Sequence, residues 1–403
     1  MEKAGIENAG NENAAIESDA PVILTRAGLD ELVEVLISSG YRVIGPTVRD
    51  NAIVLEELLS GDQLPSGWGV DSGPGSYRLR RRSDAAVFGH SAGSQSWKEF
   101  LHPPRQPLWS MDGDQFVASA PVPVRYAFLG VRACDLAAIS KLGVVLGGGA
   151  RPDGAFARRR AGLLVIAAGC TEPGGVCFCA SMGTGPAPGP GYDLSLTERI
   201  DASGHRFLVD VGTEAGARII GLLAHRVATE SEVTDAREAV GAAAQRMGRQ
   251  MPITDIRALL QQSRESPLWE DVAQRCLTCG NCTMVCPTCF CTTTEDLTDL
   301  TGEQVERSER WASCFETDFS YLHGGSVRTS GASRYRQWIT HKLGTWHDQF
   351  GSSGCVGCGR CIAWCPVGID ITAEITTLAD QRDDLEAGVD VLGSLGAPTE
   401  DPR

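Results

Sequence analysis

The chain has 403 residues, of which 51 are acidic and 36 basic, so its formal net charge is −15. This balance argues against a nucleic-acid binder, which needs basic surface to meet phosphates, and against binding to an anionic membrane surface. The longest apolar run, residues 161–170, is about half as long as a membrane-spanning helix, and the polar N-terminus lacks a secretory signal, so we expect a cytoplasmic protein.

The first elements are predicted from hydrophobic periodicity. Residues 1–20 are polar without an apolar period and predict a disordered tail. Residues 28–40 predict an amphipathic helix that ends at a glycine, and residues 41–48 and 51–58 predict short strands.

The next segment, residues 61–120, is rich in Gly, Ser, Pro and Arg and predicts ordered loops over a core. Its basic run RLRRR, residues 78–82, fits either a docking patch or, more simply, a solvated edge strand. This segment carries no recognisable chemistry of its own.

Two apolar strands then end at cysteines. The run RYAFLGVRACDLAAISKLG predicts a strand, a turn bearing Cys134, and a helix with Asp135 as its N-cap. The run GLLVIAAGC predicts a second strand ending at Cys170. Uninterrupted apolar strands indicate a sheet covered on both faces, which is typical of a parallel α/β core. Parallel strands would bring Cys134 and Cys170 to one sheet edge, where such sheets bind ligands.

A Gly- and Pro-rich loop follows Cys170 and carries Cys177 and Cys179. Residues 194–212 predict a hairpin, because two alternating apolar runs flank the turn sequence DASG. Residues 214–275 predict mostly helix.

The informative feature is a pattern of cysteines that occurs twice. The spacing C-x2-C-x2-C-x3-C followed by proline begins at Cys276 and again at Cys355. This is the run of bacterial two-cluster ferredoxins, in which the fourth cysteine binds the other cluster. One 4Fe–4S cluster would thus take Cys276, Cys279, Cys282 and Cys365, and the other Cys355, Cys358, Cys361 and Cys286. Zinc ribbons are the alternative, but they use two cysteine pairs rather than this doubled pattern.

A long insert, residues 287–354, separates the two motifs. It contains Cys289, Cys291 and Cys314 together with many aromatic residues, and we expect it to pack as helices beside the clusters or against a partner. Its histidines are interpreted as structural, because eight cysteines already satisfy two cubanes; these are His323, His341 and His347.

The remaining cysteines leave alternatives open. Cys134, Cys170, Cys177 and Cys179 suit a third 4Fe–4S cluster, because all four occur in turn or Gly-rich contexts. They could instead be buried thiols. The competing set is Cys289, Cys291 and Cys314, which would need a borrowed ligand.

Together these features predict an α/β N-terminal domain and a two-cluster, ferredoxin-like α+β C-terminal domain with a long helical insert. The predicted boundaries are a tail at 1–20, the α/β domain at 21–265, the ferredoxin-type domain at 266–375, and an acidic tail at 376–403. Phosphate-binding glycine motifs and a nucleophile elbow are absent from the sequence, so no catalytic residue or substrate site is expected.

Six phrases carry a family resemblance: GVRACDLAAI, CFCASMGTGP, RCLTCGNCTMVCPTCFC, WASC, ITHKL and FGSSGCVGCGRCIAWCPVGID. In this order they resemble the beta, iron–sulfur subunit of cytoplasmic NAD(P)-linked NiFe hydrogenases, also called sulfhydrogenases. The anaerobic sulfite reductase A subunit is similar. The likeness covers roughly residues 120–375.

The resemblance implies an electron-transfer subunit with two 4Fe–4S clusters on the eight cysteines named above, and it supports a third cluster without assigning its ligands. Its implied partners are the hydrogenase small and large subunits and a flavin subunit that binds NAD(P). The alternative is an iron–sulfur subunit of a siroheme sulfite reductase, although the phrase CIAWCPVGID is closer to the hydrogenase branch.

Overall fold

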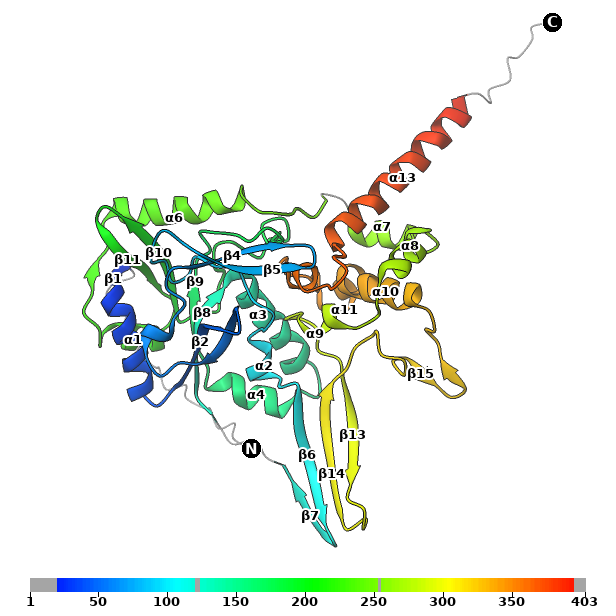
Figure 1. Cartoon of the computed structure of the whole chain (residues 1–403), viewed down its shortest axis with the longest axis horizontal. Helices are drawn as coiled ribbons and strands as arrows, with labels where there is room; N and C mark the ends of the chain where they lie inside the picture. The colour runs from blue at the N-terminus through cyan, green and yellow to red at the C-terminus, as the bar shows by residue number, and fades with distance from the viewer. Residues whose placement is uncertain (1–19, 120–123, 253–254, 395–403) are drawn as a thin grey trace, which may run out of the picture.

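The computed structural model describes residues 20–119, 124–252 and 255–394. The tail predicted at residues 1–20 lies outside the described residues except for Ala20. The N-terminal part of the chain forms a mixed eight-stranded sheet with helices on both faces (Figure 1).

The strand order across this sheet is β12-β1-β11-β10-β9-β8-β2-β3. Strands β2, β8, β9 and β10 run parallel, and the outer strands pair antiparallel. In the order across the sheet, the bounds are Arg226–Val227, Val22–Thr25, Gly204–Val211, Leu194–Asp201, Leu164–Ala168, Tyr126–Arg132, Arg42–Arg49 and Ala52–Glu57. The predicted strands, hairpin and parallel core are therefore confirmed.

Successive side chains of the buried strands face opposite layers, as the period of a strand requires. Ala127 and Leu129 of β8 pack with helix α1, whereas Phe128 packs with α3 and α4 on the other face. Helices α1 and α5 cover the first face, and α2, α3, α4 and α6 cover the second. Their bounds are Arg26–Ser38 and Glu214–Ile220, then Lys98–Leu101, Ala133–Gly147, Gly154–Ala161 and Glu230–Ala244. The helix predicted at residues 28–40 is confirmed as α1.

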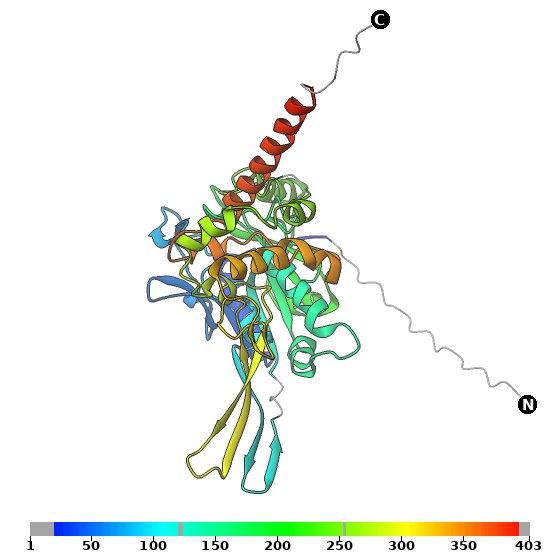
Figure 2. The ribbon, with the colours of Figure 1, turned by 90° about the vertical axis from the view of Figure 1, so that its right-hand side faces the viewer.

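A second sheet joins segments that are far apart in the chain. Its order is β13-β14-β6-β7, with bounds Thr292–Thr298, Gln304–Trp311, Arg105–Asp112 and Gln115–Ala118. Both ribbon views show it projecting from the body (Figures 1 and 2). The predicted loops at residues 61–120 thus contain strands, because β6 pairs with a distant partner. The basic run forms β5 (Ser76–Arg81), which pairs with β4 (Trp68–Gly73), as the strand interpretation expected.

The insert is helical only in its second half. Strands β13 and β14 are followed by a small hairpin of β15 (Tyr321–Leu322) and β16 (Gly325–Ser326). A helical stretch then runs through α10 (Gly331–Thr340), a π-helical turn at His341–Thr345, and α11 (Trp346–Phe350). The prediction of a helical insert is corrected accordingly: its first half is sheet because it completes the second sheet.

The other helices of the C-terminal region pack in one apolar cluster with α10. They are α7 (Ile256–Gln262), α8 (Leu268–Arg275), α9 (Asn281–Met284), α12 (Arg360–Ala363) and α13 (Ile371–Ser394). Helix α13 continues to Ser394, so the first part of the tail predicted at 376–403 is helical; Ile371, Ile375 and Leu378 recur at helical spacing and are buried at its start.

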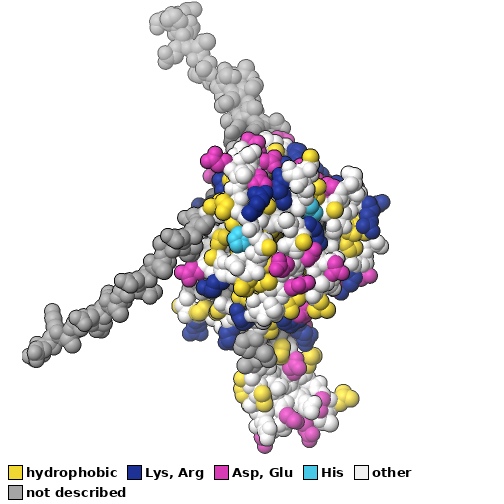
Figure 3. Space-filling view, turned by 90° about the vertical axis from the view of Figure 1, so that its left-hand side faces the viewer, with side chains coloured by type: hydrophobic (Ala, Val, Ile, Leu, Met, Phe, Trp, Pro, Cys, Tyr) yellow, Lys and Arg dark blue, Asp and Glu magenta, His cyan; other side chains and the backbone are white. Residues whose placement is uncertain are grey.

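None of the helices in the described ranges is long and apolar enough to cross a membrane. The face shown in Figure 3 carries basic and acidic side chains interspersed among apolar ones.

Candidate metal centres

The two cysteine motifs fold into loops of the same conformation. In the first loop, Thr278 and Gly280 have positive φ angles of 49° and 72°; in the second, Gly357 and Gly359 have 64° and 75°. These pairs occupy equivalent places, two and four residues after the first cysteine. Left-handed residues bend a loop tightly, so each loop gathers its thiols. The backbone N–H of Thr278 donates to Cys276 Sγ at 3.4 Å, and that of Gly357 donates to Cys355 Sγ at 3.4 Å.

The first predicted ligand set lines one cavity. Cys276, Cys279 and Cys282 lie in its wall together with Cys365, which comes from the second motif. The rest of the wall is largely apolar and includes Phe315, Tyr335, Trp338, Ile369 and Ile371. Cys361 of the second motif lines this cavity too, so the structure places thiols of both motifs around one space, and the crossed ligand assignment stays a prediction.

The second predicted set is also gathered. Cys286, Cys355 and Cys358 all lie within electrostatic range of Cys361, whose pKa burial raises well above the ordinary value of a thiol. Burial likewise raises the pKa of Cys355 to about 12. A hydrogen bond from Cys289 instead lowers the pKa of Cys286, and the ammonium of Lys342, which donates to Cys286 Sγ at 3.2 Å, lowers it further.

Both sets fit an iron–sulfur cluster by donor type and surroundings. Iron binds thiolates, so cluster assembly must displace the protons of Cys282, Cys355 and Cys361, whose pKa values are raised by burial. Backbone N–H groups donate hydrogen bonds to cysteine sulfurs of both sets. Besides the bonds from Thr278 and Gly357, Ile369 N donates to Cys365 Sγ at 3.3 Å. Within the described residues, no three His, Cys, Asp or Glu side chains are close enough together to bind one metal ion.

The third predicted set meets at the edge of the main sheet. Cys134 lies in the first turn of α3 directly after β8, and Cys170 follows β9, whose Ala168 is paired with Arg132. Cys170 and Cys177 lie within electrostatic range of Cys179, and Cys134 packs with Cys179 in one apolar cluster. The structure therefore brings these four cysteines together.

The loop bearing Cys177 and Cys179 packs directly on the second motif. Phe178 N donates to Gly357 O at 2.8 Å, and Thr184 Oγ1 donates to Val356 O at 2.7 Å. A Cβ atom on Gly357 would lie 2.6 Å from Cys179 N, so only glycine permits this approach. Cys358 consequently neighbours Cys134, Cys177 and Cys179. The third set thus adjoins the second.

A buried ion pair joins the same two regions. Arg360 of the second motif donates from Nη1 and Nη2 to the carboxylate of Asp135, at 2.7 and 3.0 Å. The two side chains are only 2% and 3% exposed. The Arg360 Nε also donates to Gly93 O and Gln95 O. The N-cap prediction for Asp135 is wrong: α3 starts at Ala133, and the carboxylate reaches across to Arg360 instead of capping the helix.

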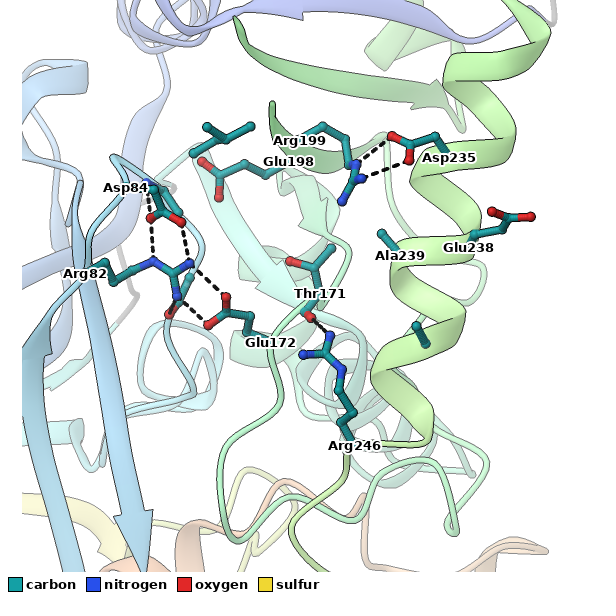
Figure 4. Close-up of a pocket in the computed structure, with 14 residues that line it drawn as sticks. Arg82, Asp84, Thr171, Glu172, Glu198, Arg199, Asp235, Glu238, Ala239 and Arg246 are labelled. Carbon is teal, nitrogen blue, oxygen red and sulfur yellow. Dashed lines mark hydrogen bonds and ion pairs between the residues drawn. The ribbon is translucent and has the colours of Figure 1, made fainter. Parts of the chain in front are cut away.

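A polar pocket holds the segment that follows Cys170 (Figure 4). Arg82 bridges Asp84 and Glu172, and Arg246 Nη2 donates to Thr171 O at 2.7 Å. Figure 4 shows these side chains converging on the residues beside Cys170. Arg82 and Arg246 thus hold the two residues that follow Cys170, so we assign the pocket the role of fixing this loop.

Three buried cations near the thiols were not predicted from the sequence: Arg360, Lys98 and Lys342. Lys98 Nζ donates to Cys289 O at 2.9 Å, and Lys342 donates to Cys286 Sγ. The one usable signal was the position of Arg360 between two cysteines of a motif. The extra cysteines of the insert, Cys289, Cys291 and Cys314, line a separate cavity with His341.

Comparisons with known proteins agree with this geometry. Residues 275–369 match the family model of the 4Fe-4S dicluster domain, which implies two 4Fe–4S clusters. The chain is 29% identical over 276 residues to sulfhydrogenase 2 subunit beta of Pyrococcus furiosus, which covers 68% of this chain and 79% of that protein. No solved structure gives a significant match. The chain is therefore an iron–sulfur electron-transfer protein with a dicluster domain, distantly homologous to the beta subunit of a sulfhydrogenase.

Proposed function

We propose that this chain is the iron–sulfur subunit of a cytoplasmic NiFe hydrogenase complex, passing electrons between the hydrogenase small subunit and a flavin subunit that handles NAD(P). The observation that carries the proposal is one cavity lined by cysteines of both motifs: Cys276, Cys279 and Cys282 from the first, and Cys361 and Cys365 from the second. The similarity to a sulfhydrogenase subunit favours this function over the sulfite reductase alternative.

The ligand assignment is part of the proposal. One 4Fe–4S cluster is held by Cys276, Cys279, Cys282 and Cys365, and the other by Cys286, Cys355, Cys358 and Cys361. Bound clusters of this kind accept and release single electrons. The chain itself contributes the thiolates, the N–H donors to sulfur, and the buried cations Lys342 and Arg360, which offset negative charge nearby.

The domain division remains a proposal as well: an α/β domain at 21–265 and a dicluster domain at 266–375. The second sheet crosses this boundary, because β6 belongs to the first part and β14 to the second. The two parts therefore share a structural element.

The proposal predicts that the isolated chain has no hydrogenase activity. A chain with clusters and no substrate site should neither oxidise hydrogen nor reduce NAD(P), but it should be reduced by a flavoprotein partner supplied with NAD(P)H. Anaerobic spectrophotometry at the cluster absorbance measures both. Hydrogen-dependent dye reduction by the pure chain, free of any large subunit, would refute the proposal.

We also propose that Cys134, Cys170, Cys177 and Cys179 bind a third 4Fe–4S cluster. In support, the four cysteines meet at one sheet edge, next to Cys358 of the second set. Such a cluster would extend the chain of centres toward the α/β surface, where a flavin subunit could deliver electrons.

The third site predicts a loss of about four irons in a full-length Cys134→Ser, Cys177→Ser variant. Iron content and the EPR spectrum of the anaerobically reconstituted, reduced protein measure it. A Ser181→Ala variant changes the same loop without removing a thiol and should keep its iron. Wild-type iron content in the double variant would show that these cysteines are structural.

A further inference from the structure

The cysteines left over in the insert share a cavity of their own. Cys289, Cys291 and Cys314 line a space of about 470 Å³, which is within the range of roughly 300–1,000 Å³ of protein ligand pockets. Cys291 and Cys314 come from the two ends of the β13–β14 hairpin, which the bond from Ala312 N to Cys291 O closes at 2.8 Å. The second sheet thereby brings together thiols that the sequence separates.

Two buried lysines face these thiols. Lys98 is 2% exposed and Lys342 is 4% exposed, and in the described part of the chain neither forms an ion pair with a carboxylate. Lys342 lies within electrostatic range of Cys289, Cys291 and Cys314. Buried charges are costly unless a counter-charge accompanies them. Besides Glu99, which is close to Lys98, the counter-charge available to these lysines is that of cysteine thiolates and of anything they bind.

The cavity also offers a fourth donor, because the imidazole of His341 lines it together with the three thiols. His341 Nε2 is 3.1 Å from Gln349 Oε1. His341 and Lys342 begin the π-helical turn that interrupts the helix between α10 and α11. Single π-turns inside helices are rare and occur often at functional sites.

We propose that Cys289, Cys291, Cys314 and His341 bind a further 4Fe–4S cluster in this cavity. The inference extends the proposed function by adding a centre on the insert side of the dicluster domain. Cys314 lies within electrostatic range of Cys282 of the first set, and Cys289 hydrogen-bonds Cys286 of the second. The centre would exchange single electrons with both clusters, with no bond made or broken. Electrons could then enter or leave the protein at the surface of the insert.

The test uses the full-length chain reconstituted anaerobically with iron and sulfide. A Cys291→Ser, Cys314→Ser variant should bind about four fewer irons than the wild type while retaining the EPR signals of the two ferredoxin clusters. The EPR signals of the two ferredoxin clusters test the proposed function, whereas the difference in iron content tests the new site. Failure of one can therefore be told from failure of the other. Unchanged iron content in the variant would overturn the site.

The histidine ligand has an independent readout. A His341→Cys variant should keep its full iron content but show a lower midpoint potential at this centre, because a thiolate carries negative charge that a neutral imidazole lacks. His347→Cys is the matched control, since His347 lines a different cavity, and it should leave the potential unchanged. Equal potentials in His341→Cys and wild type would remove His341 from the ligand set.

Discussion

A chain carrying both Cys279→Ala and Cys358→Ala is expected to lose about eight irons relative to the wild type, the content of two cubanes. Cys279 lines the cavity of the first set, and Cys358 lies within electrostatic range of Cys286 in the second. Each substitution removes one of the four thiolates proposed to hold its cluster. Iron and sulfide determination, with EPR of the reduced protein, measures the loss.

The control for this variant is Leu277→Ala, which changes an exposed side chain in the same loop. That protein should keep its full iron content. If the double cysteine variant also kept all its iron, the assignment of the two clusters to these motifs would be untenable.

The second large effect is expected on stability. Asp135→Asn leaves the buried guanidinium of Arg360 without its counter-charge, and such a change costs about 3–5 kcal/mol of unfolding free energy. The comparison is made by denaturant unfolding of the reconstituted proteins under anaerobic conditions. The loss should come with weaker docking of the α/β domain on the second motif, because this pair joins them.

The exposed pair of Arg80 and Asp71, at 3.0 Å, supplies the control. Asp71→Asn should change the unfolding free energy by less than about 1 kcal/mol, because solvent screens surface ion pairs. Similar small losses in both variants would mean that the buried pair is not what joins the two regions.

The sequence predicted the features that are encoded locally. The cysteine spacing fixes which thiols share a loop, and it predicted that Cys365 of the second motif lies near Cys276 of the first. Uninterrupted apolar runs predicted β8 and β9 as parallel strands, because such strands need cover on both faces.

Features that depend on distant partners were missed. Asp135 has the local pattern of an N-cap, but its partner Arg360 is 225 positions away. The burial of Lys98 and Lys342 could not be predicted either, because lysine is seldom fully buried and its burial here depends on charges brought by the fold. β6 and β14 are polar and half exposed, so their sequence shows no apolar alternation to predict a sheet.

The pairing of β6 with β14 has a consequence for how the chain folds during synthesis. Arg105 is paired with Arg310, so the β6–β7 hairpin leaves the ribosome long before its partner strand exists. Until then the free edge of β6 exposes unpaired backbone groups, which are prone to bind other chains. A ribosome that stalls before residue 304 would therefore release an aggregation-prone protein, and the α/β region can complete its fold only after the first cysteine motif has emerged.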